Sequence, residues 1–209
     1  LTLMNTKKTE LLFVTLMIEL MKVGGRGMSV VPSGVLENEN DSAYIQLRKE
    51  LVEKQKLIGI INMPRGIFMA SSKKGSASKG AGVQTCYLIF EKTNKGGTDN
   101  VWFYNMENDG YTLDAKRNPI DDSDIPDIIN RFNNLDNEKN RTRKDKSFMV
   151  PVNEIINNNY YLGINKYRTI EIPTTIYEDP KKIYKEIEQL EKEYNAGLKE
   201  LGGFILWKG

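Results

Sequence analysis

The sequence predicts an α/β fold built on a sheet of buried strands. Three apolar runs, Met28–Val31, Leu57–Met63 and Cys86–Phe90, are each short enough to form one strand. They are apolar throughout rather than alternating with polar residues, as strands covered on both faces are. The first two lead into turns that contain proline and glycine, so the three runs read as half of an α/β sheet. Because ligands in such folds bind at the carboxyl ends of the strands, the loops after Val31 and Met63 are the first places to look for a site.

The composition restricts both the chemistry and the compartment. The chain has 209 residues, a formal net charge of +2 and no histidine. Without histidine it holds no Ser-His-Asp or Cys-His nucleophile and no histidine-bearing zinc site, and we expect no metal centre. The single cysteine, Cys86, lies inside a predicted strand, so we expect no disulfide framework and a reducing, cytoplasmic location. So small a net charge neither requires nor excludes a DNA partner.

No membrane segment is expected. The longest apolar run, Leu11–Val23, is interrupted by polar residues and is too short to span a bilayer. The chain also lacks the pattern of a signal peptide. The length suits one domain with a core and an appended tail.

The chain opens with two units that each consist of a helix followed by a strand. Residues Thr9–Lys22 read as a mostly buried helix in which Thr15, Glu19 and Lys22 form a narrow polar stripe. A Gly-Gly pair ends this helix, and a strand follows over Arg26–Pro32.

The second helix is expected to begin at Asp41 or Ser42 and to run to Gln55. Its charged residues, Arg48 among them, are expected to be solvated. Its apolar residues share one stripe: Tyr44, Leu47, Leu51 and Val52. The strand Leu57–Met63 then closes the second unit.

The segment Ser71–Gly82 is rich in Gly, Ser and Lys, a composition typical of loops. A phosphate-binding loop would open a helix after a strand, whereas this segment leads into a strand. By the same criterion, the GGRG sequence at residues 24–27 ends a helix and is no dinucleotide fingerprint. We therefore expect neither kind of phosphate site.

The next two strands, Gln84–Phe90 and Val101–Met106, are separated by too few residues for a helical crossover. They are expected to be antiparallel and to pair as a hairpin or as neighbouring edge strands. The polar region after them contains a short helix near Asp124–Phe132. Its basic run, Arg141–Lys146, could contact a phosphate backbone or form a solvated surface.

We expect one α/β domain over residues 1–150 and a carboxyl-terminal extension over residues 151–209. The extension begins with a short helix at Val152–Asn157 and ends in a long helix from Asp179-Pro180 to about Leu201. Apolar or small residues recur on this helix at intervals of four and three. They are Ile183, Ile187, Leu190, Tyr194, Gly197 and Leu201. This is the spacing of a coiled-coil seam, which could pack on its own domain or on a helix of another chain.

A series of segments resembles a known family. In chain order they are GGRGMSVVPSGVL, IQLRKELVE, LIGIINMPRGIF, GVQTCYLIFEK, VWFYNM, DGYTLDAKRNPI and YYLGINKY. Together they resemble the carboxyl half of the modification (M) subunit of type I restriction-modification systems, which are adenine-N6 DNA methyltransferases. The resemblance extends to about Tyr167. It departs at Glu37, where the family usually has Phe, and at the longer Ser71–Gly82 loop.

The resemblance implies a partial Rossmann-like sheet of an S-adenosylmethionine-dependent methyltransferase, with a terminal antiparallel strand and a carboxyl-terminal helical tail. The family binds its cofactor on a glycine loop after the first strand and carries an Asn-Pro-Pro-aromatic motif after the fourth. Neither motif occurs in this sequence. The chain therefore looks like the part that begins after the catalytic loop, with no catalytic or cofactor-binding residues and no activity by itself.

The resemblance also implies a candidate for the pocket of the target base. Related adenine methyltransferases extrude the base and hold it against a face that the loop between the sixth and seventh strands helps to supply. In this sequence that position points to Phe68. The alternative, that Phe68 simply packs beneath its own turn, stays open.

For the tail, the resemblance implies docking to the DNA specificity subunit of a complex that also contains a restriction subunit and acts on double-stranded DNA. The seam from Ile183 to Leu201 supplies the candidate interface residues. A second hypothesis is a non-catalytic interaction module that retains half the fold and forms a homo-oligomer through its last helix. An Asn-Pro-Pro-aromatic motif encoded directly upstream would favour the first hypothesis, and its absence the second.

Overall fold

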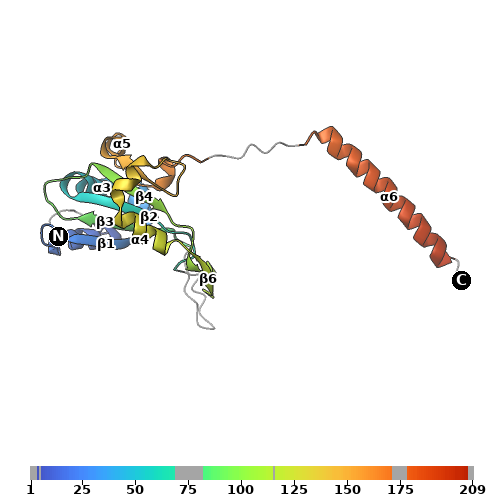
Figure 1. Ribbon diagram of the computed structural model, residues 1–209, viewed down its shortest axis with the longest axis horizontal. Helices are drawn as coiled ribbons and strands as arrows, with labels where there is room; N and C mark the ends of the chain where they lie inside the picture. Colours follow the sequence, from blue (N-terminus) through green and yellow to red (C-terminus); the bar gives the residue numbers. More distant parts are fainter. Residues whose placement is uncertain (1–3, 5, 69–81, 115, 171–177, 207–209) are drawn as a thin grey trace. The chain divides into compact units, whose positions relative to one another are not determined.

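The computed structural model describes residues 4, 6–68, 82–114, 116–170 and 178–206 (Figure 1). The chain divides into two compact units, Leu1–Ile170 and Glu171–Gly209. The boundary expected at residue 150 is therefore too early. Residues 151–170 belong to the first unit because their apolar side chains, Ile155 and Leu162 among them, are buried in its core.

The first unit is built on a five-stranded sheet in the order β1-β3-β2-β4-β7. The strands are β1 (Arg26–Pro32), β2 (Lys56–Asn62), β3 (Thr85–Glu91), β4 (Asn100–Asn105) and β7 (Ser147–Pro151). Strand β3 lies between β1 and β2 and is antiparallel to both. The expectation that the three apolar runs form one sheet is confirmed, and β3 is the antiparallel strand among them.

The expected pairing of β3 with β4 is wrong. Strand β4 pairs in parallel with β2, which separates it from β3, and its other neighbour is the antiparallel β7. Because β1 and β2 pair with both edges of β3, no edge of β3 is left for β4. The connection after β3 crosses the start of β2, where Gly96 N donates to Lys54 O at 2.9 Å.

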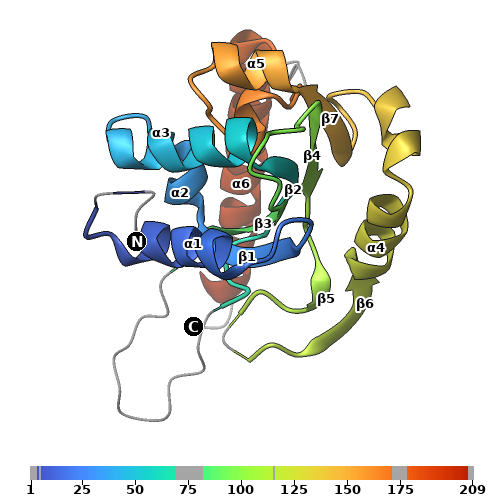
Figure 2. The same ribbon diagram turned by 90° about the vertical axis from the view of Figure 1, so that its left-hand side faces the viewer.

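Helices cover both faces of the sheet (Figure 2). On one face lie α1 (Thr9–Leu20), α2 (Ser33–Glu37) and α3 (Ser42–Lys49), the last continued by one π-helical turn, η1 (Glu50–Lys54). On the other face lie α4 (Ile125–Asn133) and the 3₁₀ segment η2 (Leu135–Asn140). Asp41 caps α3 as expected, its Oδ1 accepting from Ala43 N at 2.9 Å. The predicted helix near Asp124–Phe132 is confirmed by α4.

The rotation of α1 differs from the expected one. Thr15 is buried, whereas Phe13 and Leu20 are 67% and 77% exposed. The Thr15 hydroxyl donates to Leu11 O at 2.9 Å, so it is satisfied inside its own helix. The helix ends at Leu20, so Lys22 lies outside it. Because α1 is apolar nearly all round, the remaining two residues of the expected stripe, Thr15 and Glu19, did not determine which side faces the sheet.

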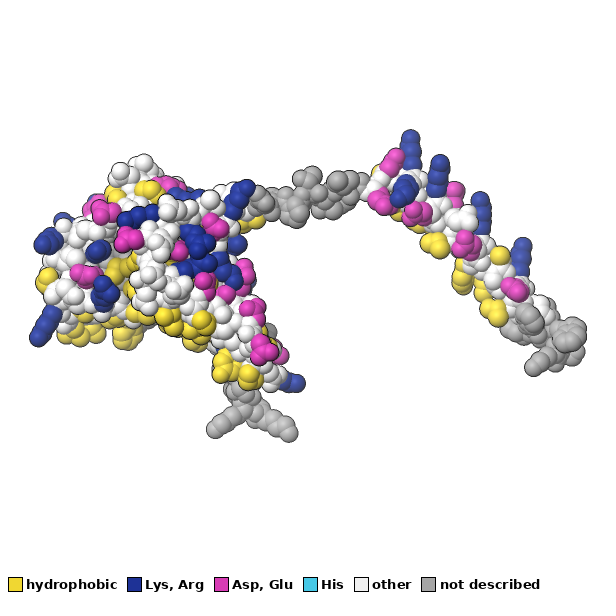
Figure 3. Space-filling model, in the orientation of Figure 1, with side chains coloured by type: hydrophobic (Ala, Val, Ile, Leu, Met, Phe, Trp, Pro, Cys, Tyr) yellow, Lys and Arg dark blue, Asp and Glu magenta, His cyan; other side chains and the backbone are white. Residues whose placement is uncertain are grey.

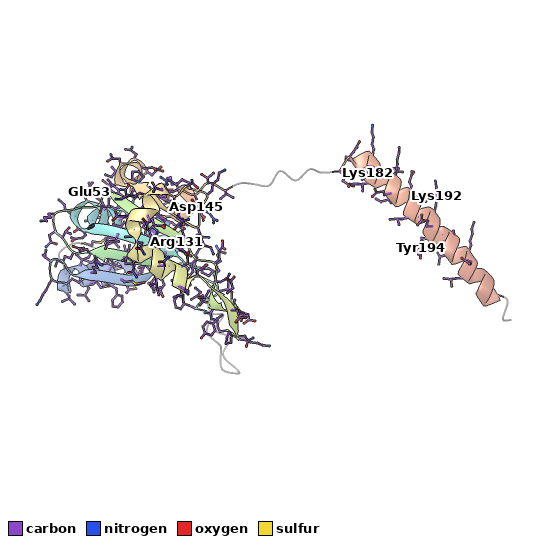
Figure 4. All side chains as sticks on the ribbon, in the orientation of Figure 1. Glu53, Arg131, Asp145, Lys182, Lys192 and Tyr194 are labelled. Atoms are coloured by element: carbon purple, nitrogen blue, oxygen red, sulfur yellow. The ribbon has the colours of Figure 1, made fainter. Side chains whose placement is uncertain are left out.

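The face of the sheet under α4 holds a buried polar network. Trp102 Nε1 donates to Glu138 Oε2 at 3.1 Å, and Ser147 Oγ donates to the same oxygen. Arg131 Nη1 donates to Ser147 Oγ at 2.9 Å, and its Nε donates to Asp127 Oδ2 at 2.7 Å. Arg131 on α4 is labelled in Figure 4. Every partner in this network is hydrogen-bonded, so it holds α4 and η2 against the sheet without leaving a buried charge unpaired.

The remaining elements are the two-stranded hairpin of β5 (Asp109–Tyr111) and β6 (Pro119–Ser123), the helix α5 (Val152–Asn157), the 3₁₀ turn η3 (Ile164–Lys166) and the helix α6 (Pro180–Leu206). Both expected carboxyl-terminal helices are confirmed, and α6 extends beyond Leu201. Asp179 Oδ1 accepts from Lys181 N at 3.0 Å at the start of α6, as an N-cap does. Within the described ranges, no helix is long and apolar enough to cross a bilayer.

Candidate functional site at the carboxyl ends of the strands

Three amide side chains meet where β2 and β4 end and β3 begins. Asn62 and Asn105 are partners in the parallel pair, and Asn62 Nδ2 donates to Asn105 Oδ1 at 2.8 Å. Gln84 Nε2 donates to Asn62 Oδ1 at 2.6 Å. These neutral amides neither gain nor lose a proton near neutral pH, so they tie the strand ends together rather than carry out acid-base chemistry.

The turn after β2, residues 64–68, lies at the same edge of the sheet. Ile67 packs against the core beneath α4, whereas Phe68 is 53% exposed. The alternative that Phe68 packs beneath its turn would require a buried side chain, and Ile67 is the residue that takes that place. Phe68 therefore presents an aromatic surface to solvent at the edge where ligands of α/β folds bind.

An apolar hollow of about 290 Å³ opens beside this turn. Its lining includes residues from segments far apart in the sequence, such as Ile61, Met63, Ile67, Met106 and Ile125, with Asp109 as the one charged side chain among the described residues that line it. No pattern along the chain joins these residues, so sequence reasoning missed the hollow. Small-molecule sites are mostly lined in this way, with few polar groups.

The segment after Val31, the second place singled out, forms α2, which ends in a carboxylate, Glu37. Burial raises the pKa of Glu37 above its usual range. Burial also raises the pKa of the Cys86 thiol to about 12, and the charge of Glu37 adds to that effect. Cys86 therefore stays a thiol at neutral pH and is no nucleophile. Across the described parts of the chain, no cluster of three or more His, Cys, Asp or Glu could hold a metal ion.

Arg48 was expected to be solvated, and this is wrong. Its side chain is fully buried and donates from Nε to Tyr160 O at 2.7 Å, from Nη1 to Val35 O at 3.0 Å and from Nη2 to Asn38 O at 2.8 Å. It thus ties α3 to the loop after α2 and to the chain after α5. The tertiary fold supplies these three carbonyls, and no spacing in the sequence indicates them.

The candidate interface residues lie on α6. Ile183, Ile187, Leu190, Tyr194 and Leu201 are all exposed, with Leu190 at 64% and Tyr194 at 67%. Apolar side chains line one side of α6 and lysines the other (Figure 3). Lys192 and Tyr194, labelled in Figure 4, leave the helix on opposite sides. A helix with one apolar side exposed along its length is typical of a helix that packs against a partner.

Comparisons with known proteins agree with this architecture. The N-6 DNA methylase family matches residues 1–174. The EcoEI type I restriction enzyme methylase subunit of Escherichia coli is 28% identical over 193 residues, 91% of this chain and 36% of that protein. The EcoKI methylase subunit of E. coli K12 is 32% identical over 127 residues, 57% of this chain and 22% of that protein. The chain thus spans roughly a third or less of the length of these curated relatives.

Solved structures show the same fold. The type I restriction-modification methyltransferase subunit of Streptococcus thermophilus superposes with a TM-score of 0.59 at 22% identity, covering 79% of this chain and 31% of that one. A second structure, described as the basis of complex assembly and conformational transition of the type I R-M system, superposes with a TM-score of 0.58 at 24% identity. The match covers 97% of this chain and 40% of that one. The sheet with its reversed β3 and the match over residues 1–174 lead to one conclusion: the chain belongs to the N-6 DNA methylase family.

Proposed function

We propose that this chain is the carboxyl-terminal part of the modification subunit of a type I restriction-modification system. The whole subunit would transfer a methyl group from S-adenosylmethionine to N6 of adenine in double-stranded DNA. The observation that carries the proposal is the family match over residues 1–174 on a sheet that is open at β1. The relatives' greater length leaves room for the half that would continue the sheet.

The edge of β1 is where that half would join. Within the described residues, β1 pairs with β3 alone. Met28 and Val30 on β1 are 52% and 42% exposed, and Phe13 of α1 is 67% exposed. Figure 3 shows hydrophobic side chains along the side of the first unit where Figure 1 places β1. Sheets with parallel strands bury both faces, and contiguous exposed apolar surface marks an interface.

The chemistry of methyl transfer indicates which groups the amino-terminal half of the subunit would supply. The exocyclic amine of adenine is a poor nucleophile until acceptors hold its protons and the methyl group lies in line with it. The side chains of Asn62, Gln84 and Asn105 bond to one another and do not make such a site. Nor does the sequence contain the glycine loop or the Asn-Pro-Pro-aromatic motif. These residues do not fit a complete site for S-adenosylmethionine, so the amino-terminal half would hold both cofactor and acceptors.

This chain would supply the surface against which the extruded adenine packs. Phe68 is exposed at the carboxyl edge of the sheet beside the apolar hollow. An aromatic surface there can stack on a flipped adenine and offset part of the lost base stacking. The position and the exposure of Phe68 support this role.

The proposed partner of α6 is the DNA specificity subunit, within an assembly that also contains a restriction subunit. The exposed seam from Ile183 to Leu201 supports this role, because apolar residues at this spacing pack well against a partner helix. The same observation supports a second candidate function, a non-catalytic module that forms a homo-oligomer through α6.

One experiment separates these functions. The complete reading frame that encodes this chain is expressed with the neighbouring specificity subunit and incubated with DNA and labelled S-adenosylmethionine. We expect label in N6-methyladenine, identified by mass spectrometry, and we expect this chain alone to bind no S-adenosylmethionine in calorimetry. A complete product that oligomerises but transfers no methyl group would favour the module instead.

A further inference from the structure

The turn that carries Phe68 rests directly on the hairpin of β5 and β6. Gly66 has a φ of +100° and is buried, and a Cβ placed on it would lie 2.5 Å from the carbonyl oxygen of Leu113. Leu113 follows β5 in the loop of the hairpin. The backbone of one segment thus touches the backbone of the other, so a shift of the hairpin loop would move the turn.

The hairpin loop is held in shape by its own polar contacts. The Arg117 guanidinium forms an ion pair with Asp109, the two side chains being 23% and 12% exposed, and Nη1 donates to Thr112 O at 3.1 Å. Asp114 Oδ1 accepts from the backbone N–H groups of Lys116 and Arg117 at 2.9 and 3.1 Å. These bonds connect the described residues of the loop to one another and to β5.

The base of the hairpin is fixed to the sheet. Asp124 Oδ2 accepts from the backbone N–H groups of Glu107 and Asn108, at 2.7 and 3.1 Å, where the chain leaves β4. Lys146, directly before β7, donates from Nζ to Asp124 Oδ1 at 2.6 Å. The hairpin is therefore attached at its base to two strands and supports the turn at its tip.

We propose that the β5–β6 hairpin positions the turn of residues 64–68, and with it Phe68, through the contact between Gly66 and Leu113. The inference rests on the proposed function, because it assigns to Phe68 the face for the extruded adenine. Gly66, Leu113 and Arg117 are positioning residues that need not touch the DNA. Since displacement by about 1 Å can cost about 100-fold in rate, a fixed support for this aromatic face matters for transfer.

The central variant is Gly66→Ala, tested in the complete subunit bound to the specificity subunit. Its methyl group would meet the Leu113 carbonyl and displace the turn. The matched control is Gly97→Ala, because Gly97 has a φ of +118° but nothing within 4 Å of an added Cβ. Both changes place a side chain at positive φ, and only the first creates the clash.

We expect Gly66→Ala to lower kcat/KM for DNA by roughly 10- to 100-fold. When 2-aminopurine replaces the target adenine, its fluorescence rises as the base leaves the stack, and we expect Gly66→Ala to weaken this rise. The Kd for S-adenosylmethionine should stay within about twofold of the value for the unaltered enzyme. Gly97→Ala should behave as the unaltered enzyme. Arg117→Met should reproduce the defect, and Arg117→Lys, which keeps the charge opposite Asp109, should restore part of the activity.

A second measurement does not depend on methyl transfer. The Thr112 amide donates to Asn118 O at 2.8 Å in the hairpin loop, so its hydrogen exchange reports the contact between Gly66 and that loop. On this chain, Gly66→Ala should speed exchange of the Thr112 amide, and Gly97→Ala should not. Equal exchange and equal base extrusion in the two variants would overturn the positioning role, even if methylation is established. A complete enzyme that methylates nothing, but shows faster exchange in Gly66→Ala alone, would overturn the proposed function and leave the positioning contact standing.

Discussion

The Arg48 guanidinium donates from Nε to the carbonyl oxygen of Tyr160 at 2.7 Å, joining residues 112 positions apart in the chain. The same side chain donates to the carbonyl oxygens of Val35 and Asn38. One buried cation therefore connects α3 to two other segments of the chain. Burial lowers the pKa of Arg48 to about 10, which still leaves the group charged at neutral pH.

Replacing this cation should destabilise the first unit strongly. Arg48→Met keeps much of the volume but leaves three carbonyls unpaired, at about 1–3 kcal/mol each where they stay buried. We expect a loss of about 3–5 kcal/mol in the free energy of unfolding, measured by urea denaturation. Lys49→Met, at the exposed neighbouring position, should change it by less than about 0.5 kcal/mol. A loss under about 1 kcal/mol for Arg48→Met would contradict the role of the three bonds.

Glu37 should make stability depend on pH. Burial raises its pKa in the folded chain above the ordinary value of 4.5, so ionisation costs more in the folded than in the unfolded state. Its contribution is fully favourable below that ordinary value and is lost as the pH rises through the folded pKa. Glu37→Gln should therefore raise the melting temperature at pH 7 and leave it nearly unchanged at pH 4. The control Glu39→Gln removes an exposed carboxylate, and an equal gain from both changes would refute the burial argument.

The open edge of β1 can be tested by one substitution in two settings. Val30 is exposed in this chain, so Val30→Lys should change the stability of the chain alone by no more than about 0.5 kcal/mol. In the complete subunit the same lysine would be buried against added strands, and the melting temperature should fall by several degrees. Ile170→Lys, also at an exposed position, should be neutral in both settings. A neutral Val30→Lys in the complete subunit would exclude joining at this edge.

The apolar side of α6 should control capture of the specificity subunit. The double variant Ile187→Asp with Leu190→Asp places two charges in the proposed helix interface. We expect at least a tenfold loss of co-purified specificity subunit from the complete modification subunit. The matched control, Lys185→Asp with Lys192→Asp, puts the same residue type on the opposite side and should bind as before. Unchanged capture by the first variant would count against α6 as the docking helix.

Local patterns in the sequence were sufficient for the elements that depend on short-range physics. Continuous apolar runs indicated β1, β2 and β3, and the Asp179-Pro180 pair indicated the start of α6. The reversed direction of β3 was expected both from the short link to the next strand and from the family resemblance, and the hydrogen bonds confirm it. Of the candidate site, the sequence pointed to the turn with Phe68 but not to the hollow beside it.

The sequence by itself determined the four strands β1 to β4 and the helices α1, α3, α4, α5 and α6, because backbone preference and apolar spacing act between near neighbours. It did not indicate β7 or the hairpin of β5 and β6. Only the tertiary structure decided that β2 lies between β3 and β4, that Thr15 faces the core and that Arg48 is buried. The same holds for the contact of Gly66 with Leu113. These relationships depend on hydrogen bonds and steric contacts between segments far apart in the chain. Contacts of this kind produce no periodic pattern in the sequence, so the sequence cannot indicate them.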